Sequence, residues 1–263
     1  SVLIPEKDHF TLCVSSQVGC AMNCRFCLTA KGGFVRNLTV GEIIAQIREA
    51  RIFLAQNHLD PLRLSNIVFM GMGEPLANYD ALVQALAIIT DTDFGMKFSA
   101  RRVTVSTCGL VPGILALGKA SCVNLAVSLN ATDNRTRSRL MPVNNTYPLE
   151  KLLAACKDFT MKPRNKITFE YILIKGVNDT PGHARHLVRL LAPVRAKVNL
   201  IAFNPHPGCD MAPPDPKTVQ AFLQILLDSN MTAILRKSKG ADILAACGQL
   251  RAQQMDADAI ETL

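Results

Sequence analysis

Three cysteines form the most recognisable chemical pattern in this sequence. Within residues 19–27, Cys20, Cys24 and Cys27 have the spacing Cys-x3-Cys-x2-Cys. Three thiolates at this spacing can bind three irons of a cuboidal 4Fe-4S cluster and leave the fourth iron without a protein ligand. An open iron can chelate the amino and carboxylate groups of S-adenosylmethionine (SAM). An electron from the cluster then splits the sulfonium and releases a 5′-deoxyadenosyl radical.

Two other interpretations of these cysteines remain open at this point. A structural zinc site usually needs a fourth Cys or His at matching spacing, and the next histidine downstream is His58, beyond an expected helix. Three unconnected core cysteines would be unusual with the polar Asn23 and Arg25 between them. The spacing therefore favours an iron–sulfur cluster over a zinc-stabilised binding protein.

The elements that must position these cysteines alternate along the chain. Nearly continuous apolar runs predict strands over 11–17, 66–71, 102–107, 123–129, 167–174, 198–203 and 232–236. Helices are expected over 39–55, 80–90, 111–119, 149–159, 180–191 and 217–230. The first of them opens with a capping box from Thr39 to Glu42. This repeat predicts an α/β fold with a parallel sheet, as a barrel or as an open doubly wound sheet, in one domain over 1–263.

In either architecture, functional residues belong on the loops that follow the carboxyl ends of the strands. Five loops that carry motifs fall there, over residues 20–27, 71–75, 106–109, 128–131 and 204–208. Their coincidence predicts a single site at one mouth of the sheet.

Charge and cysteine usage suggest the partners and the compartment. The chain has 29 basic and 21 acidic residues, which favours a polyanionic partner such as RNA. No apolar run approaches the roughly 20 residues of a membrane span. Nine cysteines do not suit a disulfide framework, so we expect a reducing cytoplasm. The basic residues expected to meet RNA are Lys31, Arg36, Arg101, Arg102, Arg135, Arg137, Arg139, Lys162, Arg164, Lys166, Arg236, Lys237 and Lys239.

Longer segments resemble the RlmN/Cfr family of radical SAM RNA methyltransferases. They are residues 11–20, 36–40, 70–76, 101–107, 140–144 and 245–250, so the resemblance spans nearly the whole chain. It implies a partial (βα)6 barrel with a C-terminal loop that closes over the mouth. The segments 17–20 (Gln-Val-Gly-Cys) and 73–75 (Gly-Glu-Pro) are more similar to the RlmN branch than to the Cfr branch.

The resemblance implies methylation of carbon 2 of an adenine in the peptidyl-transferase loop of 23S rRNA, with a tRNA anticodon-loop adenine as a further substrate. The alternative within the family is methylation of carbon 8, as in the Cfr branch. A non-catalytic, zinc-stabilised RNA-binding protein is the more distant alternative. An external electron donor such as flavodoxin or ferredoxin and a monomeric state are also expected.

The resemblance also assigns roles to residues. Cys20, Cys24 and Cys27 would bind one 4Fe-4S cluster. Cys247 would receive a methyl group from a first SAM, and a radical from a second SAM would activate that group for addition to adenine. Cys13 would then attack Cys247 and release the RNA, leaving a transient Cys13–Cys247 disulfide. The SAM contacts implied by the family are Gly73, Glu74, Ser106, Ser128, Leu129, Asn130 and Asn204.

Two further expectations concern cysteines outside the assigned roles and a segment before Ser1. Cys122 and Cys156 lie in segments with a periodic pattern of apolar residues and are predicted to be core residues. The family's small helical RNA-binding domain and its glutamate base would both precede Ser1, so we expect an upstream segment.

Overall fold

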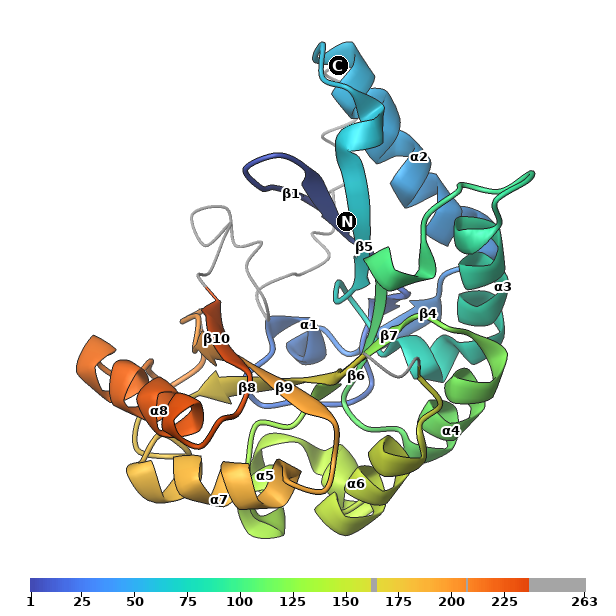
Figure 1. The fold of residues 1–263 in the computed structure, drawn as a ribbon. Helices are drawn as coiled ribbons and strands as arrows, with labels where there is room; N and C mark the ends of the chain where they lie inside the picture. The colour runs from blue at the N-terminus through green and yellow to red at the C-terminus, as the bar shows by residue number, and fades with distance from the viewer. Residues whose placement is uncertain (162–164, 207, 237–263) are drawn as a thin grey trace.

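The computed structural model describes residues 1–161, 165–206 and 208–236, and the fold is that of a curled, mostly parallel sheet covered by helices on its outer side (Figure 1). The C-terminal loop that was expected to close the mouth lies outside these ranges.

Among the described residues the main sheet has eight strands, and β2 and β5 to β10 run parallel in the order of the chain. Strand β1 is added at one edge, antiparallel to β2. The strands in sheet order are β1 (Val2–Pro5), β2 (Phe10–Cys13), β5 (Leu64–Phe69), β6 (Val103–Thr107), β7 (Asn124–Ser128), β8 (Ile167–Leu173), β9 (Ala196–Ala202) and β10 (Ala233–Arg236). This arrangement confirms the parallel barrel-like interpretation of the βα repeat.

Six longer helices form an arc around the outside of the sheet (Figure 1). All six expected helices are present within two residues of the predicted ends. The capping box at Thr39 is also confirmed, because the Thr39 N–H donates to Glu42 Oε2 over 2.8 Å and the Glu42 N–H donates to Thr39 Oγ1. The helices are α2 (Val40–Gln56), α3 (Tyr79–Thr90), α4 (Val111–Ala120), α6 (Leu149–Asp158), α7 (Pro181–Leu191) and α8 (Pro216–Asp228).

The expected strand over 11–17 is wrong in its second half. Strand β2 ends at Cys13, and residues 17–19 form a separate strand β3 (Gln17–Gly19), paired antiparallel with β4 (Phe34–Asn37). The chain leaves the sheet because backbone groups of Ser15 bond to the Gln46 side chain of α2 instead of to a strand. The resulting hairpin frames the loop that carries the three cysteines.

Other elements were not expected from the sequence. Helix α1 (Leu28–Lys31) follows the cysteine loop, and α5 (Asn134–Leu140) follows β7. Short 3-10 turns cover Pro61–Arg63, Pro75–Asn78, Ala100–Arg102 and Pro142–Asn145. Helix α5 is short, and its sequence Asn-Arg-Thr-Arg-Ser-Arg-Leu has no apolar period, which explains why it was missed.

Two apolar clusters hold these layers together. The large one fills the space between the sheet and the outer helices, with side chains such as Ile67, Val105 and Phe169 almost wholly buried. The small one lies around the cysteine loop and contains Phe26, Cys108, Leu140, Met141, Ile174 and Phe203. Within the described ranges, no helix is both long and apolar enough to cross a bilayer.

Candidate active site

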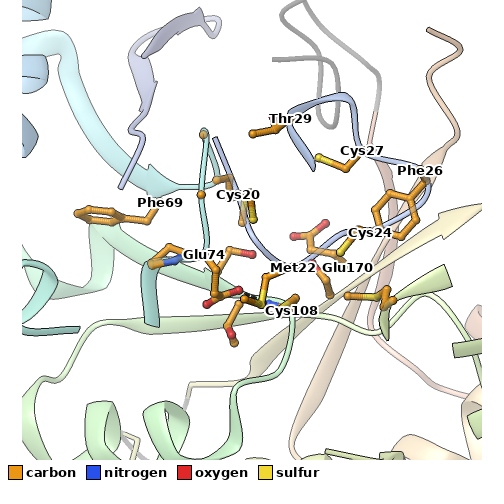
Figure 2. Close-up of a pocket in the computed structure, with 18 of the residues that line it drawn as sticks. Cys20, Met22, Cys24, Phe26, Cys27, Thr29, Phe69, Glu74, Cys108 and Glu170 are labelled. Carbon is orange, nitrogen blue, oxygen red and sulfur yellow. Dashed lines mark hydrogen bonds between the residues drawn. The ribbon is translucent and has the colours of Figure 1, made fainter. Parts of the chain in front are cut away.

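A pocket lies where the carboxyl ends of the parallel strands meet the cysteine loop (Figure 2). The pocket is open to solvent at its mouth, and the space within it and in front of it amounts to about 920 Å³. Residues of β5, β6, β7, β8 and β9, together with the loops after β5 and β6, contribute to its walls. The single site expected at one mouth of the sheet is therefore present as a cavity.

Seven of the predicted site residues line this pocket. They are Cys20, Cys24, Cys27, Gly73, Glu74, Ser106 and Ser128. In the view of Figure 2, Cys20 and Cys27 lie at the top of the pocket, and Glu74 and Cys108 lie below them. Residues up to 108 positions apart in sequence, from the cysteine loop to Ser128, thus meet at one cavity.

The cysteine loop is held at its start, its middle and its end. The Cys20 N–H donates to the Gly33 carbonyl over 2.8 Å, which ties the loop to the β3–β4 hairpin. The Arg25 N–H donates to the Leu140 carbonyl over 2.9 Å, which ties it to α5. A tight turn closes it, because the Cys27 N–H donates to the Cys24 carbonyl over 3.1 Å. The polar residues between the cysteines therefore lie in an ordered loop, which disfavours the interpretation of three unconnected core cysteines.

Burial and nearby negative charge act on two of the thiols, Cys20 and Cys24. Burial raises the pKa of Cys20 to about 11, and negative charge on Glu74 and Cys27 adds to this effect. Burial raises the pKa of Cys24 further, and charges on Cys27, Cys20 and Glu74 act in the same direction. Metal ligation requires thiolates, so a cation here would replace protons and remove the repulsion between the sulfurs.

This donor set fits an iron–sulfur cluster. Three soft sulfur donors at one wall of a pocket suit iron in a thiolate-bound cluster, and the remaining cavity leaves room for a small molecule beside them. Across the described part of the chain, no group of three His, Cys, Asp or Glu side chains is arranged to hold a single metal ion.

Glu74 forms the opposite wall and is rigidly held. Its carboxylate accepts from the Cys108 N–H over 2.7 Å and from the Leu76 N–H over 3.1 Å. Its own N–H donates to Gln17 Oε1 over 2.8 Å. Only 3% of Glu74 is exposed, and burial raises the pKa of its carboxyl. A buried acceptor of this kind suits the ammonium group of a ligand, because a charge-assisted hydrogen bond would offset its desolvation.

Three predicted SAM contacts do not line the pocket. Leu129 and Asn130 are buried, and the Asn130 side chain is engaged within the protein, since its Oδ1 accepts from the Ile172 N–H over 2.9 Å. Asn130 also has a positive φ of 57°, which Asn tolerates better than most residues. Asn204 lies on the loop after β9. Their proposed contacts with a cofactor stay predictions.

Only one of the two cysteines expected to form a transient disulfide lies within the described residues. Cys13 is the last residue of β2 and is 8% exposed, and Cys247 lies outside the described residues. No disulfide joins two of the eight cysteines that the structure describes, so the Cys13–Cys247 bond stays a prediction. Cys156 is buried as predicted, whereas Cys122 is exposed in the loop between α4 and β7, so its assignment to the core was wrong.

Arg137 was expected to meet RNA, and this prediction is wrong. Its exposed fraction is 0%, and its guanidinium donates to the carbonyl oxygens of Cys108, Ser128 and Leu129 behind the pocket wall. An arginine in a charged, polar segment usually faces solvent. Only the packing of α5 against the strand ends buries it.

Glu170 is a pocket residue that the sequence analysis missed. It lies on β8, is 7% exposed, and accepts from Asn199 Nδ2 over 2.8 Å. Burial raises the pKa of its carboxyl. A charged residue within the otherwise apolar strand Ile167–Leu173 is the signal that could have identified it.

Comparisons with known proteins agree with this geometry. The radical SAM superfamily matches residues 14–188. A "Dual-specificity RNA methyltransferase RlmN" from Desulfosudis oleivorans is 60% identical over 252 residues, covering 96% of this chain and 67% of the relative. The protein of the same description from Syntrophobacter fumaroxidans is 53% identical over 253 residues, covering 96% and 72%. A crystal structure of a radical SAM methyltransferase from Sphaerobacter thermophilus has a TM-score of 0.89 and 44% identity, covering 95% of this chain and 73% of that one.

Proposed function

Because this chain belongs to the RlmN family of radical SAM RNA methyltransferases, we propose that it methylates carbon 2 of adenine in 23S rRNA and tRNA. The observation that carries the proposal is the pocket in which Cys20, Cys24 and Cys27 face a buried, rigidly held Glu74. In keeping with reduced thiols, we place the protein in the cytoplasm as a monomer that takes electrons from a flavodoxin- or ferredoxin-type donor.

The residues of the pocket divide between two cofactors. Cys20, Cys24 and Cys27 would hold a 4Fe-4S cluster, which would supply the electron that cleaves SAM bound beside it. Gly73 and Glu74 meet the methionine end of SAM, since Glu74 offers an acceptor to its ammonium group. Ser106 and Ser128 supply hydroxyls at the ends of β6 and β7. Together the two cofactors supply a carbon radical strong enough to take hydrogen from a methyl group.

Two further cysteines handle the methyl group. An adenine ring carbon is a poor nucleophile, so direct transfer from a sulfonium is not available to it. The Cys247 thiolate instead takes the methyl group from a first SAM and presents it as a thioether for activation. Once the methylene carbon has bonded to adenine, the adduct would have to give up one electron and the ring proton before the Cys13 thiolate attacks the Cys247 sulfur. That attack would break the bond between the Cys247 sulfur and the methylene carbon, which takes up a proton to become the methyl group, and would leave a disulfide for an external dithiol to reduce.

Nucleoside mass spectrometry tests this function directly. The chain is expressed in a strain that lacks its own enzyme of this type, and 23S rRNA and tRNA are digested separately. We expect 2-methyladenosine in both pools, its absence with Cys24→Ala, and its persistence with Cys122→Ala, because Cys122 is exposed and away from the pocket. Formation of 8-methyladenosine would assign the Cfr-type reaction, and no methyladenosine from a cluster-loaded protein would refute the proposal.

A further inference from the structure

The buried guanidinium of Arg137 is the most unusual charge in the described structure. Most of its N–H groups donate to backbone carbonyls at the ends of two strands and to one side-chain amide. Nε donates to the Leu129 carbonyl over 3.1 Å, and Nη2 donates to the carbonyls of Cys108 and Ser128 over 2.7 and 3.1 Å. Nη1 donates to Asn144 Oδ1 over 3.0 Å. All of these acceptors are neutral, so the hydrogen bonds solvate the charge without cancelling it.

No carboxylate among the residues that the structure describes lies within ion-pair distance of this guanidinium. Burial lowers the pKa of Arg137, whereas negative charge on Cys108, Cys24 and Cys156 would act in the opposite direction. An arginine nevertheless keeps its proton in proteins. Buried charges are almost always paired, so this cation calls for an anionic partner that the described residues do not provide.

The surroundings of Arg137 point toward the cysteine loop. Cys108, whose carbonyl it binds, belongs to the small apolar cluster in which Cys24 and Phe26 also pack. Leu140, one turn further along α5, accepts the hydrogen bond from the Arg25 N–H in the middle of that loop. Helix α5 therefore contacts both the strand ends, through Arg137, and the cysteine loop, through Leu140.

We propose that Arg137 is a positioning residue whose fixed positive charge raises the reduction potential of the cluster bound by Cys20, Cys24 and Cys27. This inference rests on the proposed function for the presence of the cluster. A cuboidal cluster held by three thiolates has a net negative charge, which grows by one when the cluster takes up an electron. Net charge and burial are among the properties that set such potentials, and a cation acts strongly on them in a region of low dielectric constant.

The same guanidinium also has a structural role, and the test must separate the two. The Cys108 peptide accepts from Arg137 through its carbonyl and donates to Glu74 through its N–H over 2.7 Å. Removal of the side chain would therefore disturb the opposite wall as well as the charge. Asn144 offers a way around this difficulty, because it already accepts from the guanidinium.

The decisive variant is Asn144→Asp, which keeps Arg137 in place and adds a carboxylate against it. Asn144→Ala is the uncharged comparison, because both variants lose the Nδ2 group that donates to Ser138 Oγ over 2.9 Å and to Asn134 O and Oδ1 over 3.2 and 3.1 Å. The full chain is reconstituted anaerobically with iron and sulfide, and the midpoint potential is measured by redox titration followed by electron paramagnetic resonance. We expect a more negative potential for Asn144→Asp than for Asn144→Ala, and a potential close to that of the wild type for Arg137→Lys.

Equal potentials for the two Asn144 variants would overturn the inference and leave Arg137 with a structural role alone. A cluster that Asn144→Ala retains and Asn144→Asp loses counts in its favour, because the added negative charge has then destabilised an anionic group. If neither Asn144 variant binds a cluster, the potentials of Arg137→Lys and Arg137→Gln are compared instead. A more negative potential for Arg137→Gln supports the inference, and equal potentials overturn it. A wild-type protein that binds no cluster would refute the proposed function instead, and this result is obtained before any variant is made.

Discussion

Gly73→Ala is the substitution whose effect on cofactor binding follows most directly from the geometry. Gly73 has φ +99°, which an L-residue rarely adopts, and a Cβ placed there would lie 2.5 Å from Cβ and 2.7 Å from Cγ of Gln17. Gln17 has little room to yield, because its amide donates to Asn37 and accepts from the Glu74 N–H, each over 2.8 Å. The new methyl group must therefore displace the loop that presents Glu74.

The magnitude is the sum of three effects. Backbone strain costs about 1–2 kcal/mol, the steric overlap about 1–3 kcal/mol, and loss of the hydrogen bond between Gln17 and Glu74 about 1 kcal/mol. In the free protein the loop can relax and avoid part of this cost, so we use the lower end of the sum, about 3 kcal/mol. SAM must restore the original loop geometry when it binds, so its affinity falls by this amount, which is ~100-fold in the dissociation constant.

Isothermal titration calorimetry of SAM with the cluster-loaded protein measures this change. Gly176→Ala is the matched control, because Gly176 also has a positive φ of 69° but a Cβ there would meet nothing within 4 Å. We expect only a small loss of stability and unchanged SAM affinity for the control. If Gly73→Ala binds SAM as tightly as the wild type, or if both variants lose affinity equally, the steric reasoning is refuted.

Three further predictions use the same kind of paired comparison. Cys24→Ser should abolish iron and sulfide binding after reconstitution, whereas the exposed Cys122→Ser should retain both; equal retention would contradict the proposed ligand set. Phe222→Ala should lower the free energy of unfolding by about 3–5 kcal/mol, because this side chain is 1% exposed. Phe94→Ala should leave it unchanged, because Phe94 is 99% exposed; denaturant unfolding of the apoprotein distinguishes them. Hydrogen bonds from Arg36 lower the pKa of Glu42 to about 2, so its stabilising effect is present above its unfolded pKa of about 4.3 and is lost as the pH falls toward 2. Glu42→Gln should accordingly lower the melting temperature at pH 6 and less so near pH 2.5; an equal loss at both pH values would exclude a charge effect.

The βα repeat could be predicted from the sequence because its signals are local. Apolar runs define buried parallel strands wherever they fall, and the capping box at Thr39 and Glu42 uses only atoms three residues apart. The path of the backbone over residues 14–17 could not be predicted in this way. The chain leaves the sheet at Ser15 because Gln46, 31 residues later, supplies the competing hydrogen bonds.

The features of the site also fall into those that the sequence determines and those that only the tertiary structure determines. The spacing of Cys20, Cys24 and Cys27 determined by itself that three thiols share one loop, because ligand spacing is a property of the chain. Only the tertiary structure placed Glu74 opposite them, buried Arg137 behind the wall and put Glu170 in the same cavity. Burial and hydrogen-bond partners depend on residues far away in sequence. For that reason, the identity of a charged residue could not show whether it faces water or a cofactor.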